Sequence, residues 1–182
     1  MNIRNASVKK IAFSGVMAAL STVILVAAGL IPIAAAALPA LAGCLAIPVV
    51  VEAGKKWAVS VYSVSGFFAL FLTADKEAAL LYLLFFGYYP ILYAVLGRIR
   101  KRIPRMIVKL LVFNAAVILE SLISVYILGI PFESIEMLGA FFIPILLIAA
   151  NGVFIIYDYA LDGLIAMYIQ RFHAKFRNMF KF

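Results

Sequence analysis

Residues 11–31 read IAFSGVMAALSTVILVAAGLI, a run of 21 residues without a charged side chain. A helix needs about 20 predominantly apolar residues to cross the roughly 30 Å hydrocarbon core of a bilayer, so this run has the length of a membrane span. We do not expect a cleaved signal peptide, because the run is followed by further apolar sequence and not by a polar mature domain. This stretch therefore predicts a transmembrane helix.

The remainder of the chain has the same character. Of its 182 residues, 67% are hydrophobic and 13% are charged, whereas soluble domains are roughly 45–50% apolar and about 25% charged. The apolar runs are continuous and do not alternate with polar residues, which disfavours a transmembrane β-barrel. We expect one all-α domain over residues 1–182 with six transmembrane helices, at about residues 10–31, 34–52, 57–73, 78–97, 106–128 and 137–169.

The basic residues are distributed unevenly over the connections between these spans. On one side lies Lys76 alone, while all the others fall on the opposite side, which the positive-inside rule assigns to the cytoplasm together with both termini. That cytoplasmic group consists of Arg4, Lys9, Lys10, Lys55, Lys56, Arg98, Arg100, Lys101, Arg102, Arg105, Lys109, Arg171, Lys175, Arg177 and Lys181. The run at 98–102 fits contact with anionic lipid or with an acidic cytoplasmic partner, and both interpretations stay open. Nucleic-acid binding is not expected, because no groove-reading or aromatic context accompanies the charge.

Several classes of chemistry lack the residues they need. Cys44 is the only cysteine, so no disulfide forms within the chain, and His173 is the only histidine, so neither a metal site nor a Ser-His-Asp constellation is expected. No Walker A loop is present, so the chain does not bind ATP by that device. We therefore expect no catalytic residues and no cofactor, and we favour a binding, transport or scaffold protein over an enzyme.

Polar groups inside apolar spans are costly, which makes each one a candidate functional residue. At roughly 100° per residue, Asp158 and Asp162 fall about 20° on either side of Asn151, so we expect one polar stripe that faces protein or water. For Asp158 a ligand contact and an internal ion pair both stay open. For Asp162 we expect an ion pair with a cytoplasmic base.

A second polar group lies in the fifth span. Glu120 and Ser124 are four residues apart and share a helix face. Helix–helix hydrogen bonding and a buried pocket in which Glu120 meets a ligand are the two interpretations. The fourth span opens outward with Tyr82 and contains Tyr88, Tyr89 and Tyr93. These last three offer flat apolar rings with hydroxyl groups, which suit an aromatic small molecule, an interfacial belt or the packing of the core.

The first span carries small residues at helical spacing, namely Ser14 with Ala18 and Gly15 with Ala19. Such pairs allow another helix to approach closely. The approaching helix belongs either to this chain or to a partner subunit.

The opening segment, residues 9–20 (KKIAFSGVMAAL), resembles the start of the substrate-binding S subunits of energy-coupling factor transporters. Those subunits have a similar length, six spans and cytoplasmic termini. Their first span carries an alanine-x-x-x-alanine type motif that contacts a transmembrane coupling subunit. The matching positions here are Ser14 and Ala18 or Gly15 and Ala19, a small-residue variant of that motif.

The resemblance implies a protein of a cell membrane, most commonly bacterial, that captures a vitamin or other trace nutrient from outside. It implies transfer of the nutrient, by toppling of the subunit, to a complex of one coupling subunit and two cytoplasmic ATPases, which hydrolyse the ATP. It places the binding site in the outer half, under the connections near residues 31–39, 73–78 and 129–137. For ligand contact we expect Tyr82, Tyr88, Tyr89, Glu120, Asn151 and Asp158.

Other functions remain open beside this one. A non-transporting scaffold that assembles envelope proteins, like the six-span rod-shape-determining membrane proteins, has a similar size and span count and needs no ligand pocket. A stand-alone secondary transporter is less favoured, since such proteins usually contain two related halves and residues 1–91 and 92–182 show no convincing repeat.

Overall fold

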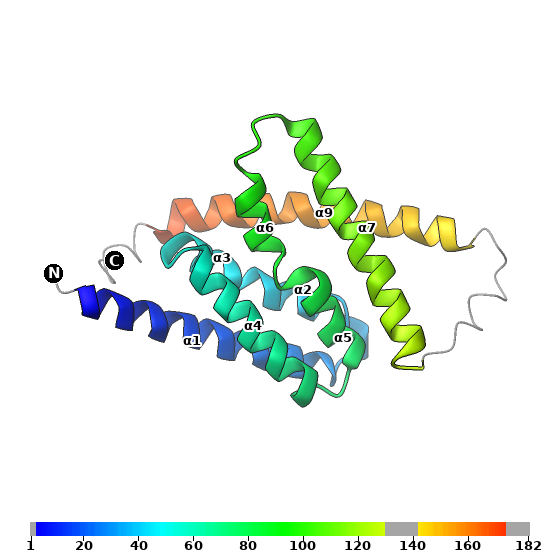
Figure 1. Cartoon of the computed structure of the whole chain (residues 1–182), viewed down its shortest axis with the longest axis horizontal. Helices are drawn as coiled ribbons and strands as arrows, with labels where there is room; N and C mark the ends of the chain where they lie inside the picture. The colour runs from blue at the N-terminus through cyan, green and yellow to red at the C-terminus, as the bar shows by residue number, and fades with distance from the viewer. Residues whose placement is uncertain (1–2, 130–141, 174–182) are drawn as a thin grey trace.

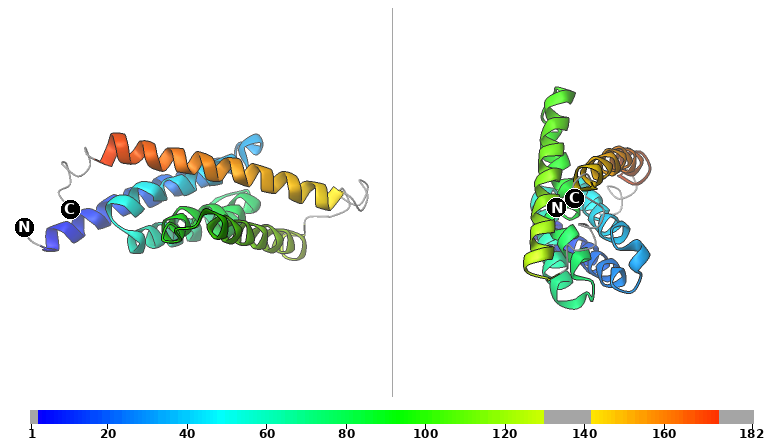
Figure 2. Two further views of the ribbon diagram at one scale, coloured as in Figure 1. Left: turned by 90° about the horizontal axis from the view of Figure 1, so that it is seen from above. Right: turned by 90° about the vertical axis from the view of Figure 1, so that its right-hand side faces the viewer.

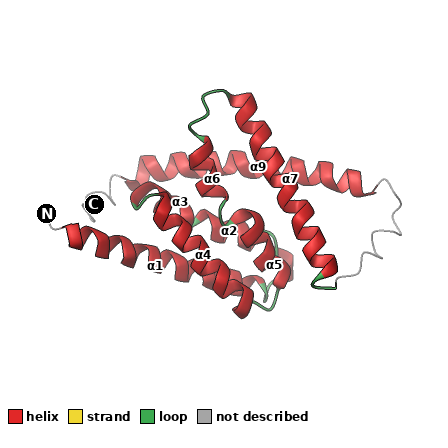
Figure 3. Cartoon of the chain, in the orientation of Figure 1, coloured by secondary structure: helices red, strands yellow, loops and turns green. Residues whose placement is uncertain are grey.

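The computed structural model of the chain describes residues 3–129 and 142–173, which form helices and turns without a strand (Figure 3). The start of the sixth expected span at 137–141 and the bases Lys175, Arg177 and Lys181 lie outside these residues. The elements in order are α1 (Ile3–Ala28), η1 (Pro32–Ala34), α2 (Ala37–Cys44), α3 (Ala46–Glu52), α4 (Lys55–Leu72), α5 (Lys76–Leu81), η2 (Tyr82–Phe86), α6 (Tyr89–Leu96), α7 (Arg102–Tyr126), α9 (Phe142–Tyr168) and η3 (Ile169–His173). The expected all-helical class is therefore confirmed.

Within the described residues, four stretches are long and apolar enough to cross a membrane, which is consistent with a multi-pass membrane protein. These stretches are Ser7–Ala28, Lys76–Leu96, Arg102–Tyr126 and Pro144–His173, and a shorter apolar stretch covers Ala37–Glu52. The remaining expected span coincides with α4, which begins with Lys55 and Lys56. A count of six spans and a cytoplasmic location of the termini stay predictions.

Side-chain contacts gather the connections at two opposite ends of the bundle. At what we call the basic end, where residues 52–55, 94–101 and 168–173 lie, Lys55 Nζ donates a hydrogen bond to the Ala94 carbonyl (3.2 Å). At the acidic end, where residues 29–36, 73–77 and 127–129 lie, Thr73 Oγ1 donates to the Leu25 carbonyl (3.1 Å). The chain thus passes back and forth between two ends, with the start of α1 and the end of α9 on the same side (Figure 1).

The first four passes, α1 to α6, pack closely because their contact surfaces are built from small residues. Ala42, Ala58, Ala69 and Ala79 are almost completely buried between them. At Gly43 the backbones nearly touch, since a Cβ atom there would lie 2.2 Å from the Phe86 carbonyl oxygen. Any larger residue at this position would push α2 away from η2.

Proline residues divide two of the passes into shorter helices. Pro48 has no N–H group and its ring crowds the preceding turn, so the second pass breaks at Leu45 between α2 and α3. The fourth pass breaks before Pro90, where five residues of π-helix, η2, separate α5 from α6. The Leu83 carbonyl within η2 accepts a hydrogen bond from the Tyr62 hydroxyl (2.8 Å), which compensates for the irregular backbone.

The last two long helices, α7 and α9, lie on the outside of this body. Figures 1 and 2 show that α7 crosses α9 at a steep angle, so that the two helices approach each other over a short region. Their buried hydrophobic contacts with η2 and α6 form one aromatic-rich cluster that includes Phe85, Tyr89 and Phe154. The two buried charged side chains among the described residues, Lys109 and Asp158, lie on these two helices.

We expect replacement of Gly43 by alanine to lower the free energy of unfolding by about 1–3 kcal/mol, because the added methyl group meets backbone and not a flexible side chain. Chemical or thermal unfolding of the purified protein in detergent measures this loss. Gly152→Ala is the matched control, since open space surrounds that position. Equal stability of the two variants would contradict the close approach of α2 and η2.

Candidate functional site

A cavity of about 280 Å³ lies between η2, α7 and α9. Its volume is near the lower limit of about 300–1,000 Å³ that is usual for small-molecule sites. Among the described residues, aromatic and aliphatic side chains form almost all of its wall, and Glu120 supplies the one formal charge. The lining consists of Ala36, Leu81, Leu84, Phe85, Phe86, Phe113, Ala116, Val117, Glu120, Ala150, Val153, Phe154 and Tyr157.

Three aromatic rings in mutual contact form part of this wall, one from each surrounding element. Phe113 of α7 and Phe154 of α9 lie parallel with their centroids 4.6 Å apart. Phe85 of η2 meets both of them edge to face, with centroid distances of 5.1 Å and 5.7 Å. Because each ring contacts the other two, this aromatic layer joins η2, α7 and α9.

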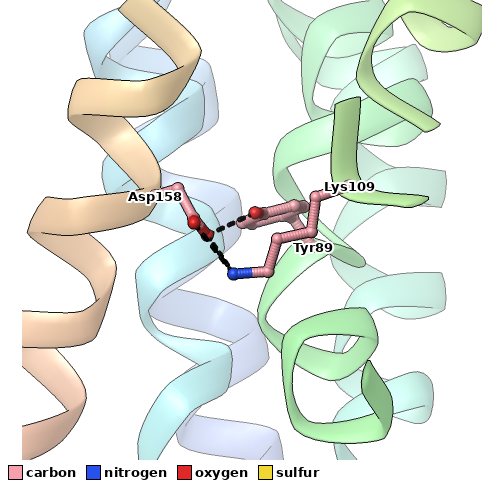
Figure 4. Close-up of polar contacts among 3 residues, drawn as sticks. All are labelled: Tyr89, Lys109 and Asp158. Carbon is pink, nitrogen blue, oxygen red and sulfur yellow. Dashed lines mark hydrogen bonds and ion pairs between the residues drawn. The ribbon is translucent and has the colours of Figure 1, made fainter. Parts of the chain in front are cut away.

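A polar triad, Tyr89, Lys109 and Asp158, joins α6, α7 and α9 (Figure 4). Along each of these elements it lies closer to the basic end than the aromatic layer does. Each member is four residues from one of the three rings, so the triad forms a second layer on the same elements. Lys109 Nζ donates to both carboxylate oxygens of Asp158, at 2.6 Å and 2.8 Å. The Tyr89 hydroxyl donates to Oδ1 of the same carboxylate at 2.5 Å.

The charges of the triad are buried and compensate each other. Lys109 is 3% exposed and Asp158 is 8% exposed. Lys109 Nζ also lies 4.1 Å from the centroid of the Tyr93 ring, in cation–π geometry. Of the two interpretations for Asp158, this geometry supports the internal ion pair, which connects α7 to α9.

Lys109 is the member of the triad that sequence reasoning missed. Its basic side chain suggests a place in the cytoplasmic group, but the structure buries it within the bundle, two turns into α7. Its neighbours in the sequence could have indicated this burial, because residues 106–108 and 110–113 on either side of it are all apolar. A lone cation with apolar flanks requires a buried partner, and Asp158 provides it.

The expected polar stripe of α9 also needs a correction. Asn151 is half-buried and Asp158 is buried, but Asp162 is exposed and forms no ion pair with any residue that the structure describes. The buried face continues through Leu161 and then Ile165. The residues of this buried face are separated alternately by three and four positions. Asp162 directly follows Leu161, so its side chain is rotated about 100° around the helix from that of Leu161. The salt bridge expected for Asp162 is therefore not formed within the described residues.

Glu120 and Ser124 share a helix face as expected. Ser124 Oγ donates a hydrogen bond to Glu120 Oε1 (3.0 Å), and the carboxylate borders the cavity. Asn151 has a different role, since its side-chain amide exchanges two hydrogen bonds with Asn114 of α7, at 2.9 Å and 3.0 Å. Asn151 therefore holds α7 against α9 beside the cavity without lining it.

The three tyrosines separate because η2 turns them toward different neighbours. Tyr89 enters the triad, whereas Tyr82 is buried on the other side of the pass, where its hydroxyl lies 2.9 Å from Ser65 Oγ. Tyr88 is half-buried and meets the Tyr62 ring edge to face at 6.0 Å. Of the six expected ligand residues, the structure brings Glu120 into the cavity wall, and it places Tyr89 and Asp158 directly behind the aromatic layer.

The small residues of α1 line a second, open hollow of about 560 Å³ between α1 and α4. Ser14 and Ala18 are buried toward α4, while Gly15 and Ala19 are exposed in the groove. No heavy atom lies within 4 Å of a Cβ built at Gly15. The groove wall is apolar along most of its length, with Trp57, Val61, Val64 and Phe68 on the α4 side.

Comparison of the chain with protein-family models, with curated proteins and with solved structures gave no match. The likeness of the opening segment to S subunits therefore stays an expectation. The cavity, the triad and the groove are the structural features that bear on the function of the chain.

We expect Asp158→Asn to lower the free energy of unfolding by about 3–5 kcal/mol, because it leaves the Lys109 ammonium buried without a counter-charge. The double variant Lys109→Met, Asp158→Leu removes both charges and should recover most of that loss. Unfolding in detergent measures all three proteins. Asp162→Asn, an exposed carboxylate on the same helix, should stay within about 0.5 kcal/mol of the parent, and a loss as large as that of Asp158→Asn would refute the special role of the pair.

Proposed function

We propose that this chain is a membrane-embedded binding subunit that captures a small, vitamin-like molecule from outside the cell for uptake driven by partner ATPases. The observation that carries this proposal is the aromatic-walled cavity with a single carboxylate between η2, α7 and α9. Pockets of this composition, apolar with a few polar groups that fix orientation, are typical of small-molecule sites. A scaffold protein needs no such cavity.

The position of the cavity agrees with capture from outside. Ala36 belongs to the connection after α1, and Leu81 follows the turn after α4, so the wall includes residues close to the acidic end. The distribution of basic residues assigns this end to the outer side of the membrane. A molecule arriving from outside would meet the cavity before it met the aromatic layer.

The structure between the cavity and the basic end favours movement of the whole subunit over passage of the ligand through a channel in the subunit. A ligand that continued toward the basic end would have to separate the stacked Phe113 and Phe154 rings and then pass the buried Lys109–Asp158 pair. Breaking a buried pair costs several kcal/mol, which disfavours this route. Release inside is easier if the subunit reorients in the membrane within a complex, as the S subunits that this sequence resembles do.

The α1–α4 groove is the surface best suited to contact a transmembrane coupling subunit. Gly15 and Ala19 present almost no side chain there, and small residues of this kind let a foreign helix come close to the backbone. Ser14 and Ala18, in contrast, are engaged with α4 of the same chain. The docking face of the motif is therefore the Gly15–Ala19 pair.

We expect the gently purified protein to carry a stoichiometric small molecule, identified by native mass spectrometry followed by denaturation. Val117→Phe should remove it, because the larger ring fills the cavity. Ile118→Phe is the control, since the neighbouring Ile118 is exposed and does not line the cavity. Envelope-assembly proteins bound to a ligand-free chain would point instead to the scaffold, and retention of the ligand by Val117→Phe would show that the cavity is not its site.

We expect Gly15→Leu and Ala19→Leu to break co-purification with a membrane subunit and its ATPases by at least ten-fold while the bound small molecule is retained. The added side chains fill the groove, and both positions are exposed, so the fold itself tolerates them. Val16→Leu, on an exposed part of α1 outside the groove, is the matched control. An intact complex in both groove variants would refute this docking face.

A further inference from the structure

We propose that the cavity selects a ligand with an aromatic ring on a short arm that ends in a protonated nitrogen, with Glu120 as the counter-charge. This inference rests on the proposed function and names its substrate class. It follows from a count of the charges available to Glu120, from the contacts of that side chain and from the composition of the cavity wall.

The chain has almost no base that could neutralise Glu120. Residues 11–54 and 110–170 contain no lysine, arginine or histidine, and residues 57–97 contain Lys76 alone. The segment between α7 and α9 lies within the base-free range, so it adds no positive charge near the cavity either. Apart from the bases of the basic end and the chain ends, the candidates are therefore Lys76, which is exposed at the acidic end, and Lys109, which is buried in α7.

Both of these lysines are already engaged. Lys109 is held by the Asp158 carboxylate behind the aromatic layer. Lys76 Nζ donates hydrogen bonds of 2.8 Å to the carbonyls of Leu70 and Thr73, where it caps the end of α4. Neither ammonium group pairs with Glu120 in the structure.

The Glu120 carboxylate has unused hydrogen-bonding capacity. Among the described residues its hydrogen bond comes from Ser124, which donates to Oε1 and brings no charge. A second acidic residue at the same end, Glu77, interacts with it electrostatically, and this interaction is repulsive. An uncompensated carboxylate at the edge of an apolar cavity is costly, and a cationic ligand would remove that cost.

The cavity wall suits a cation as well as a ring. Phe85, Phe86, Phe113, Phe154 and Tyr157 present aromatic surfaces to the cavity, and such surfaces attract positive charge through their quadrupole. Phe113 and Glu120 are seven residues apart on α7, which corresponds to about 10 Å along the helix. A ring placed against the aromatic layer would therefore need a short arm to bring its nitrogen to the carboxylate.

A matched series of three probes tests this charge preference. 2-Phenylethylamine, 2-phenylethanol and phenylacetate share one ring and one arm but end in a cation, a neutral hydroxyl and an anion. Isothermal titration of the full chain, freed of bound ligand and held in lipid nanodiscs, measures the three affinities. We expect the amine to bind at least ten-fold more tightly than the alcohol and phenylacetate to bind most weakly.

The variant Glu120→Gln should lower the affinity for the amine to that for the alcohol and leave the alcohol unchanged, because it removes the charge and keeps the shape. Glu77→Gln, an exposed carboxylate at the same end, is the control and should change the amine affinity less than three-fold. A thermal unfolding midpoint of Glu120→Gln at or above that of the ligand-free parent verifies that the variant folds, because the substitution removes an uncompensated charge.

Three results of the titrations would overturn the inference. They are equal binding of amine and alcohol by the parent, an amine preference that survives Glu120→Gln, and binding of none of the three probes at millimolar concentration. None of these results contradicts the proposed function, which is tested separately by the native ligand. A native ligand that is lost in Val117→Phe would still establish the cavity as the binding site. A native ligand without a basic nitrogen would likewise refute the charge preference alone.

Discussion

The arrangement of the last two helices depends on the buried contact of Lys109 with Asp158 and Tyr89. Few other residues of α7 and α9 are buried, and most of their apolar side chains face outward. In hydrocarbon such side chains gain little by leaving lipid for protein, so packing alone does not decide which helices meet. The ion pair decides it, because each charge needs the other. The cavity exists where it does because this contact and the Asn114–Asn151 pair hold α7 and α9 beside η2.

The two carboxylates of the α7–α9 region illustrate how one chemical group serves two purposes. Asp158 has its charge compensated and its oxygens satisfied, so it contributes to architecture. Glu120 borders the cavity, its hydrogen bond among the described residues comes from Ser124, and we propose that it meets a ligand. The aromatic layer between them keeps these roles apart, because it shields the ion pair from the contents of the cavity.

The sequence predicts the features that depend on local spacing. Long apolar runs define most of the helical passes, and the Glu120–Ser124 contact follows from a separation of four residues. Features that depend on packing between distant elements are not predictable in this way. Lys109 contacts Asp158, which is 49 positions further along the chain. The buried face of α9 includes Leu161 and not Asp162. The irregular helix η2 places Tyr82 and Tyr89 on opposite sides of one pass.

The distance between Lys109 and Asp158 along the chain also has a consequence for synthesis. A membrane protein leaves the ribosome from its N-terminus, so α1 to α6 can assemble from small apolar surfaces as soon as they emerge. When α7 enters the bilayer, its ammonium group lacks its buried partner Asp158 until α9 has been made. In that interval α7 is a helix with an unpaired cation, which favours a position near the membrane surface or beside a chaperone. Arrival of the final helix is then the event that draws α7 into place, and it forms the cavity in the same step.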